Sequence, residues 1–236
     1  MNHFFSSDFH GYHKNICSGT TSWELTGEGS HQKTRPFKDQ YEMTDKMVEN
    51  INKTVGQDDI LHYLGDWSFG GIESIWNLRK RIICKNIHFI YGNHDHHIEN
   101  NAILPNVHRA EPYSSTFVDG KGIHTRDSEY PDYVEAQSLF KSVNYYKELS
   151  LNKQRIVLSH FAFRVWNKSH HGAWHLYGHS HNTLDNINGR ANPYGKSMDV
   201  GIDAHPEFRP FHLEEIRKIM EKRSVLFVDH HSKQTN

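Results

Sequence analysis

The sequence of 236 residues lacks the features that mark secreted, membrane-spanning or strongly charged proteins. It has two cysteines, Cys17 and Cys84, and neither belongs to a CxxC pair, so a disulfide framework is excluded and reduced thiols are expected. No apolar run approaches the ~18 residues that a membrane span needs. Lysines and arginines number 27 against 28 aspartates and glutamates, which argues against both a basic nucleic-acid arm and an acidic disordered tail.

Repeats, low-complexity tracts and linkers are also missing, so we predict a single domain over residues 1–236. Within it, residues 119–140 are polar and aperiodic and are predicted to form a surface insertion, and residues 224–236 a C-terminal extension. Met1 runs straight into an apolar segment without a targeting signal. The expected location is therefore the cytoplasm, without a membrane partner.

Histidine is the abundant residue, with 21 copies in the chain. It is the commonest metal ligand in proteins and the usual acid or base at neutral pH. An excess of histidine proves nothing by itself, but it makes clusters of histidine with carboxylates the first feature to look for.

Strands and helices are predicted to alternate in the first 95 residues, which favours parallel strand–helix–strand units. Apolar residues recur every four positions at Met43, Met47, Ile51 and Val55, as on one face of a helix. The predicted elements are strands at 2–7, 59–64 and 86–91, helices at about 39–55 and 72–83, and a long polar loop at 11–36.

The second part of the chain is predicted to be richer in strands. Two of them meet at a tight turn, Asn152-Lys153, which predicts a hairpin. The chain is expected to close with a helix from Leu213 to Arg223. The predicted strands are 113–118, 143–150, 154–159, 174–177, 198–202 and 225–228.

Groups that can bind metals follow five of the predicted strands. In parallel α/β sheets, ligands gather outside the carboxyl ends of the strands, so these five segments are expected to converge. The candidate ligands are Asp8, His10, Asp66, Asn93, His160, His179 and His181.

Two aspartates, four histidines and one asparagine form a mixed nitrogen and oxygen ligand set, which suits Mn²⁺, Fe or Zn²⁺. Seven ligands are too many for one tetrahedral ion, but they fit two ions if one carboxylate bridges them. Paired ions can clamp the attacking and leaving oxygens of a phosphoryl displacement. With Asp8, Asp66 and one hydroxide, two divalent ions give the site a formal charge of about +1, which suits an anionic substrate.

The ordered motifs Asp8-x-His10, Gly65-Asp66, Gly92-Asn93-His94-Asp95, His160 and Gly178-His179-x-His181 resemble those of the calcineurin-like metallophosphoesterase superfamily. Further segments are similar to a small bacterial and phage subgroup of predicted phosphoesterases. These segments are His13–Ile16, Arg35–Phe37, Leu64–Gly70, Trp174–His181 and Asp199–His205.

The resemblance implies an α/β fold in which two mixed β-sheets pack as a sandwich flanked by helices, the four-layer αββα arrangement. It implies that Asp8, His10, Asp66 and His181 hold the first metal, and that Asp66, Asn93, His160 and His179 hold the second, with Asp66 as the bridge. His94 would act as a general acid or support the transition state, and Asp95 would orient its imidazole.

The expected function is therefore that of a dinuclear-metal phosphohydrolase, a phosphodiesterase for a nucleotide or another phosphodiester, with a hydroxide on the metals as nucleophile. Mn²⁺ is the expected metal, with Fe, Zn²⁺ or Ni²⁺ as alternatives. Arg35, Trp67 and Arg164 are candidate substrate-binding residues. A phosphomonoesterase or protein phosphatase is the alternative, followed by a nuclease or a non-catalytic scaffold. No obligate nucleic-acid partner is evident, and the oligomeric state stays open.

Overall fold

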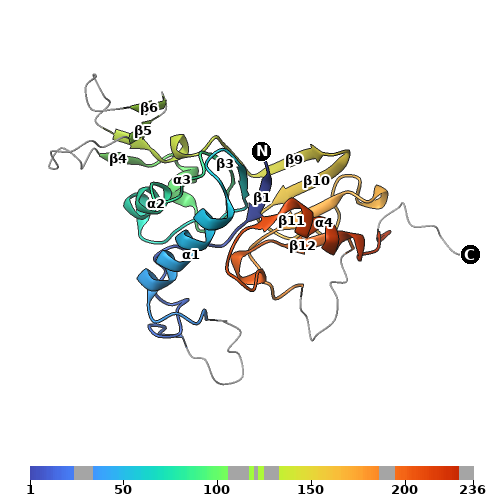
Figure 1. Cartoon of the computed structure of the whole chain (residues 1–236), viewed down its shortest axis with the longest axis horizontal. Coiled ribbons are helices and arrows are strands. Elements are labelled where there is room, and N and C mark those ends of the chain that lie inside the picture. Colours follow the sequence, from blue (N-terminus) through green and yellow to red (C-terminus); the bar gives the residue numbers. More distant parts are fainter. Residues whose placement is uncertain (24–33, 106–116, 120–121, 125–132, 186–194, 229–236) are drawn as a thin grey trace, which may run out of the picture.

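The computed structural model describes residues 1–23, 34–105, 117–119, 122–124, 133–185 and 195–228. Two main β-sheets and four α-helices form the described part of the chain (Figure 1). The helices are α1 (Gln40–Thr54), α2 (Gly71–Arg79), α3 (His96–Glu99) and α4 (Leu213–Glu221). The predicted α/β class is confirmed at this level.

The first sheet has five strands in the order β13-β1-β2-β3-β8. Its four strands β1, β2, β3 and β8 run parallel, and β13 pairs antiparallel with β1 at the edge. Parallel order follows from the crossover helices α1 and α2, as the alternation in the sequence predicts. The strands span His3–Ser6 (β1), Ile60–Tyr63 (β2), Asn86–Ile90 (β3), Ser142–Asn144 (β8) and Phe211–His212 (β13).

The second sheet has four strands in the order β12-β11-β10-β9. Strands β9 and β10 form the predicted hairpin, with φ angles of 50° at Asn152 and 67° at Lys153, as in the two-residue turns that match strand twist. Strands β10, β11 and β12 run parallel. Their bounds are Tyr146–Leu151 (β9), Gln154–Ser159 (β10), Trp174–Tyr177 (β11) and Ser197–Asp199 (β12).

Short elements complete the described chain. Strand β4 (Ile103–Pro105) pairs with β7 (Tyr133–Glu135), and β5 (Phe117–Asp119) pairs with β6 (Gly122–His124). Three 3₁₀-helices are η2 (Ala136–Leu139), η3 (Ser169–His171) and η5 (Ile202–Ala204).

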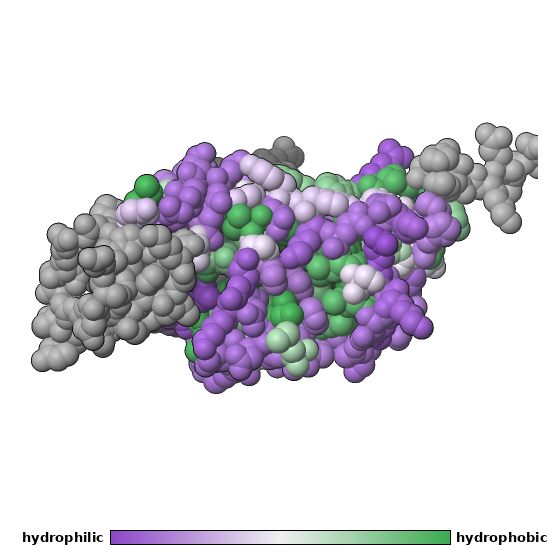
Figure 2. All heavy atoms as spheres, turned by 90° about the horizontal axis from the view of Figure 1, so that it is seen from above, coloured by the Kyte–Doolittle hydropathy of each residue, from purple (hydrophilic) through white to green (hydrophobic). Residues whose placement is uncertain are grey.

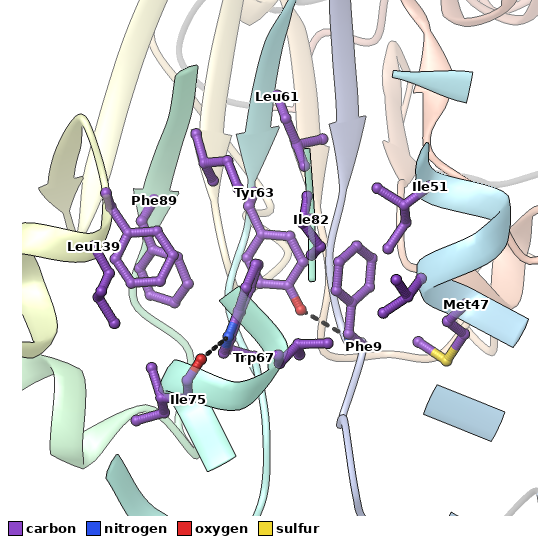
Figure 3. Close-up of a cluster of buried hydrophobic side chains, with 14 of the residues drawn as sticks. Phe9, Met47, Ile51, Leu61, Tyr63, Trp67, Ile75, Ile82, Phe89 and Leu139 are labelled. Atoms are coloured by element: carbon purple, nitrogen blue, oxygen red, sulfur yellow. Dashed lines mark hydrogen bonds between the residues drawn. The ribbon is translucent and has the colours of Figure 1, made fainter. Parts of the chain in front are cut away.

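Helices α1 and α2 cover one face of the first sheet. Asp39 caps α1 by accepting backbone N–H bonds from Tyr41 and Glu42, both at 2.9 Å. The apolar stripe of α1, including Met47 and Ile51, faces aromatic side chains of the sheet (Figure 3). This apolar cluster supports the loops that carry the candidate metal ligands.

A second apolar cluster lies between the two sheets, because successive residues of a strand point to opposite faces. Phe4 joins the cluster under α1, whereas Phe5 joins the one between the sheets. Helix α4 adds Leu213, Ile216 and Met220 to this inner cluster. The packing of both faces of the first sheet fixes where its strands end.

Two expectations from the sequence are wrong in part. Residues 225–228 form no strand. The C-terminal part of the predicted surface insertion belongs to the core, where Val134, Ala136 and Leu139 pack with the first sheet. Residues 106–116, 120–121 and 125–132, which include most of the predicted strand at 113–118, lie outside the described residues.

The described helices include none with the length and apolar composition needed to cross a membrane. On the face of the molecule drawn in Figure 2, hydrophobic side chains form separate patches between hydrophilic ones.

His175 on β11 is a fully buried histidine that serves the fold. Its Nδ1 donates to the carbonyl oxygen of Val157 at 3.2 Å, and its Nε2 accepts the backbone N–H of Phe163 at 3.0 Å. Only the neutral ring makes both bonds. Burial lowers its pKa to about 4.

The contribution of His175 to the free energy of unfolding is expected to fall as the pH drops from about 6.5 towards 4. In that window the unfolded chain binds a proton at His175 that the folded chain excludes, so this contribution rises with pH and levels off above 6.5. The full effect is about 3 kcal/mol. Urea unfolding of metal-free protein across this range measures it, and His175→Gln should flatten the curve. Parallel curves for wild type and variant would contradict the assignment.

Candidate metal centre

The seven predicted ligands follow the carboxyl ends of β1, β2, β3, β10 and β11, and backbone hydrogen bonds tie their loops together. The backbone N–H of Asp8 donates to the carbonyl oxygen of Gly65 at 2.9 Å, and the backbone N–H of His10 donates to the carbonyl oxygen of Asp66 at 3.0 Å. The N–H of Gly178 donates to His160 at 2.9 Å. Segments far apart in the sequence are thus joined at one site.

The ligand atoms form two groups. In the first, atoms of Asp8, His10 and His181 lie within 4.8 Å of one another, and the two histidine Nε2 atoms are 3.2 Å apart. In the second, atoms of Asp66, His160 and His179 lie within 4.8 Å of one another.

Asn93 completes the second group. Its Oδ1 lies 2.9 Å from Nε2 of His160 and 2.9 Å from Nδ1 of His179. An amide oxygen is a ligand that adds no charge. These separations match those between neighbouring ligand atoms around a metal bound at about 2.1 Å.

The two groups meet at the carboxylate of Asp66. Its Oδ2 is 3.5 Å from Nε2 of His10 and 3.6 Å from Nε2 of His160. Its Oδ1 accepts the backbone N–H of His94 at 2.9 Å, which holds the carboxylate in this orientation. One oxygen atom therefore faces both groups, as a bridging ligand must.

The proton positions of the imidazoles fit a cation. Nδ1 of His160 lies 2.7 Å from the carbonyl oxygen of Leu64, which can only accept, so Nδ1 carries a proton and Nε2 is the ring atom that faces the Asn93 oxygen. When Nε2 carries no proton, it and the amide oxygen are two acceptors 2.9 Å apart. A metal cation between them would relieve their repulsion, so the donor set of the second group fits a metal ion.

Five of the seven predicted ligands have a positive φ, which is uncommon outside glycine. Each such residue costs roughly 1–3 kcal/mol and persists only where the surroundings impose it. The five residues are Asp8 (56°), His10 (48°), Asp66 (61°), His179 (64°) and His181 (46°). Backbone strain concentrated at the predicted ligands indicates a functional site.

The backbone at the site is tightly packed as well. Gly65 has a φ of +95°, and a Cβ there would lie 2.6 Å from Gly92 Cα. The Tyr63 hydroxyl accepts the N–H of Phe9 at 2.8 Å (Figure 3) and donates to the carbonyl of Asp66 at 2.9 Å. Tyr63 therefore joins the first two ligand loops from inside the core.

Negative charge exceeds positive charge among the described residues around the site. Five aspartates face a single buried guanidinium, that of Arg35, so four formal negative charges are left and two divalent cations would neutralise them. These aspartates are Asp8, Asp66, Asp95, Asp199 and Asp203. The charge of about +1 expected from the sequence counted only two of them, so the site is less positive than predicted.

Burial disfavours the charged forms of three of these carboxylates, those of Asp66, Asp95 and Asp199. It raises the pKa of Asp66 to about 6, and the neighbouring His160 opposes this rise whereas Asp8 adds to it. Burial, followed by the charge of Asp8, raises the pKa of Asp199 to about 7. Asp199 accepts the N–H groups of Asn182 and Gly201, which holds the loop that carries His181.

Asp95 has a different role from the one the resemblance implies, whereas His94 lies beside the ligand groups. The His94 side chain is exposed and its ring lies 5.6 Å from that of His10. Asp95, predicted to orient His94, instead accepts backbone N–H bonds from Asp66 (2.7 Å), Trp67 (2.9 Å) and Gly92 (2.7 Å). It binds the loops after β2 and β3 to each other, so the prediction of a bond to the imidazole is corrected.

Two of the predicted substrate-binding residues are buried. Trp67 is fully buried, its ring packs against Tyr63 and Phe140, and its Nε1–H donates to the carbonyl of Ile75 at 3.3 Å (Figure 3). Arg35 is 2% exposed and its guanidinium is held by protein acceptors. Neither can reach a substrate, which corrects both predictions.

Arg164 is exposed and lines a cavity of about 270 Å³ with Phe163, Tyr177 and Leu184. Its role in binding substrate stays a prediction. Sequence reasoning missed Phe161, which is 48% exposed and packs edge-on against His160 and His179 at ring distances of 5.0 and 4.7 Å. Its position directly after a predicted ligand was the available signal.

No family model matches the chain, and no curated protein matches it. Its structure is similar to that of AQ665 from Aquifex aeolicus, a protein of unknown function. The two are 17% identical, and the match covers 92% of this chain and 98% of that one with a TM-score of 0.55. This likeness shows the fold alone.

A second match is to YfcE, a phosphoesterase from E. coli. It is also 17% identical and covers 86% of this chain and 79% of that one, with a TM-score of 0.37. A similarity this low carries no argument about the present chain, whose own geometry has to supply the evidence for its function.

Proposed function

We propose that this protein is a dinuclear-metal phosphohydrolase of the calcineurin-like metallophosphoesterase type, with the four-layer sandwich of that family, and that it acts on a phosphodiester. The observation that carries the proposal is the position of Asp66, whose Oδ2 faces two groups of ligand atoms at once. Histidines and aspartates that gather incidentally on a surface would not be expected to surround one buried carboxylate oxygen.

The first ion would be held by Asp8, His10, His181 and Asp66, and the second by Asp66, Asn93, His160 and His179. When bound, two such ions would activate a water molecule at neutral pH and offset charge on the phosphoryl oxygens. The nitrogen and oxygen ligand set suits Mn²⁺ best, with Fe, Zn²⁺ or Ni²⁺ as alternatives.

His94 supplies the acid in this proposal. Its exposed imidazole stands beside His10, and its backbone N–H is fixed on Asp66, so the ring is placed at the edge of the ligand groups without belonging to either. From there it can donate a proton to the leaving-group oxygen, which departs as an alcohol.

The charge balance favours a diester over a monoester. With two divalent ions and one hydroxide the described site has a formal charge of about −1, so a dianionic monoester is harder to hold than a monoanionic diester. Arg35, which could have offered the extra positive charge, is committed to protein acceptors. The exposed ring of Phe161 beside the second group offers a surface on which a nucleobase can stack, which favours a nucleotide.

Hydrolysis of paired chromogenic mono- and diester phosphates tests the proposal. Protein stripped with a chelator should be inactive, and Mn²⁺ should restore diester turnover and raise the melting temperature, because an ion that binds only the folded state stabilises it. A diester that carries a nucleoside should be cleaved faster than the matching methyl ester.

The two alternatives predict different results. Dominant turnover of the monoester would replace the substrate class and favour a phosphomonoesterase. Absence of turnover with both metals bound would contradict an enzymatic role and favour the scaffold alternative.

A further inference from the structure

Arg35 lies at the end of the long polar loop, far in sequence from every predicted ligand, yet its guanidinium is buried beneath the first ligand group. Nη2 donates to the carbonyl oxygen of Asp8 at 2.5 Å, and Nη1 donates to that of Phe9 at 2.7 Å. These two carbonyls belong to the turn that carries Asp8 and His10, both of which have a positive φ. Arg35 thus holds the strained turn from below.

The same guanidinium also reaches the third ligand of this group. Nε and Nη2 donate to the two carboxylate oxygens of Asp203 at 2.8 and 2.6 Å. Asp203 Oδ2 lies 2.7 Å from Nδ1 of His181 and accepts a hydrogen bond from it. The proton is thereby fixed on Nδ1, which leaves the lone pair of Nε2 facing His10.

The hydrogen bonds of Arg35 therefore reach Asp8 directly and His181 through Asp203. They reach His10 only through the carbonyl of Phe9, which forms the peptide bond to His10. The hydrogen-bond partners that hold the second group differ: Nδ1 of His160 donates to the carbonyl oxygen of Leu64, and Asp66 accepts the backbone N–H of His94. The two groups share Asp66 as a ligand, but this guanidinium bonds directly only to the segment of the first group. It reaches the second group indirectly, through the Asp8 carboxylate, which accepts the backbone N–H of His179 at 3.0 Å.

We infer that Arg35 is a positioning residue that assembles the first metal site selectively, through the backbone of Asp8 and Phe9 and through the Asp203–His181 pair. The inference rests on the proposed dinuclear centre and adds that one of its two ions depends on the loop that ends at Arg35. The planar fork of arginine serves a carboxylate and two carbonyls simultaneously, whereas the single ammonium of lysine cannot span them.

Mn²⁺ titration of the metal-free protein, followed by electron paramagnetic resonance, tests the inference. Wild type should bind two ions and show the spectrum of a spin-coupled pair. Arg35→Met should weaken one ion by about 10- to 100-fold, the usual effect of removing a group that orients a metal ligand, and leave the spectrum of isolated Mn²⁺. Arg35→Lys should recover part of the affinity.

Arg79→Met is the matched control. Arg79 is a partly buried arginine that, like Arg35, donates to two backbone carbonyls, those of Leu139 and Ile82, at 2.9 and 3.0 Å. Its loss should lower the melting temperature and keep both ions. Asp203→Asn gives a second route if Arg35→Met does not fold, because the asparagine oxygen still accepts from His181 while the charged pair with Arg35 is lost. It too should weaken one ion only.

Equal weakening of both ions in Arg35→Met and Asp203→Asn, or full retention of both, would overturn the selective role. Failure of wild type to bind a coupled pair would instead contradict the dinuclear centre itself. The two failures are therefore distinguished by the wild-type titration.

Discussion

Replacing Asp66 with asparagine is expected to abolish hydrolysis and to reduce the metal content below two ions per chain. The asparagine oxygen can keep the bond from the backbone N–H of His94, since that bond uses Oδ1. The amide nitrogen then takes the place of Oδ2, the atom that faces both ligand groups. Its hydrogens would point at the positions where the cations bind.

The expected loss of activity is large because metal ions supply several kcal/mol of transition-state stabilisation, and about 4 kcal/mol corresponds to ~10³-fold in rate. The fold should survive. Burial raises the pKa of Asp66 to about 6, so removal of its charge relieves a cost in the metal-free protein. The melting temperature of metal-free Asp66→Asn is expected to equal or exceed that of wild type.

Metal analysis after gel filtration, steady-state hydrolysis and thermal melting measure the three effects together. Asp45→Asn is the control, because Asp45 is an exposed carboxylate that pairs with Arg81 on the surface. Full metal content together with wild-type turnover in Asp66→Asn would show that this carboxylate is not the bridge.

Replacing His94 with alanine is expected to keep both metal ions and slow the chemical step by about 10²- to 10⁴-fold, the usual range for loss of a general acid. The imidazole is exposed and is not among the atoms of either ligand group. The bond from residue 94 to Asp66 comes from the backbone and survives the substitution. The decrease should therefore appear in kcat and not in metal affinity.

A series of diesters whose leaving groups differ in basicity identifies the role of His94. Basic alcohols need the donated proton most, so His94→Ala should lose the largest factor on them and the smallest on acidic phenols. His96→Ala is the control, since His96 lies on α3 with its ring against His97. An equal loss on every leaving group would argue for electrostatic support instead, and a loss of metal would make His94 a ligand.

Much of the fold followed from periodic patterns in the sequence. The four-residue spacing of Met43, Met47 and Ile51 predicted α1, and its observed bounds differ from the predicted ones by one residue at each end. Strand β11 occupies the predicted residues 174–177. The pattern failed at 133–140, where a short polar segment hides Val134 and Leu139, because two short elements carry too few residues to show a period.

The candidate ligands could be proposed from the sequence because they sit directly after strands, and the topology of a parallel sheet brings strand ends to one edge. The roles of the surrounding residues could not. Asp95 and Arg35 find their partners through backbone groups of other loops, and a sequence does not show which way those groups point.

The residue types of the candidate centre, their order along the chain and their attachment to strand ends could all be predicted from the amino-acid sequence. The tertiary structure alone decided that Asp66 Oδ2 lies between two ligand groups, that Trp67 is buried, and that Arg35 supports Asp8 and His181 instead of a substrate. Periodicity and strand ends are local properties of the chain and can be seen in the sequence. Burial and hydrogen-bond partners arise only when segments far apart in the sequence pack together, so they cannot.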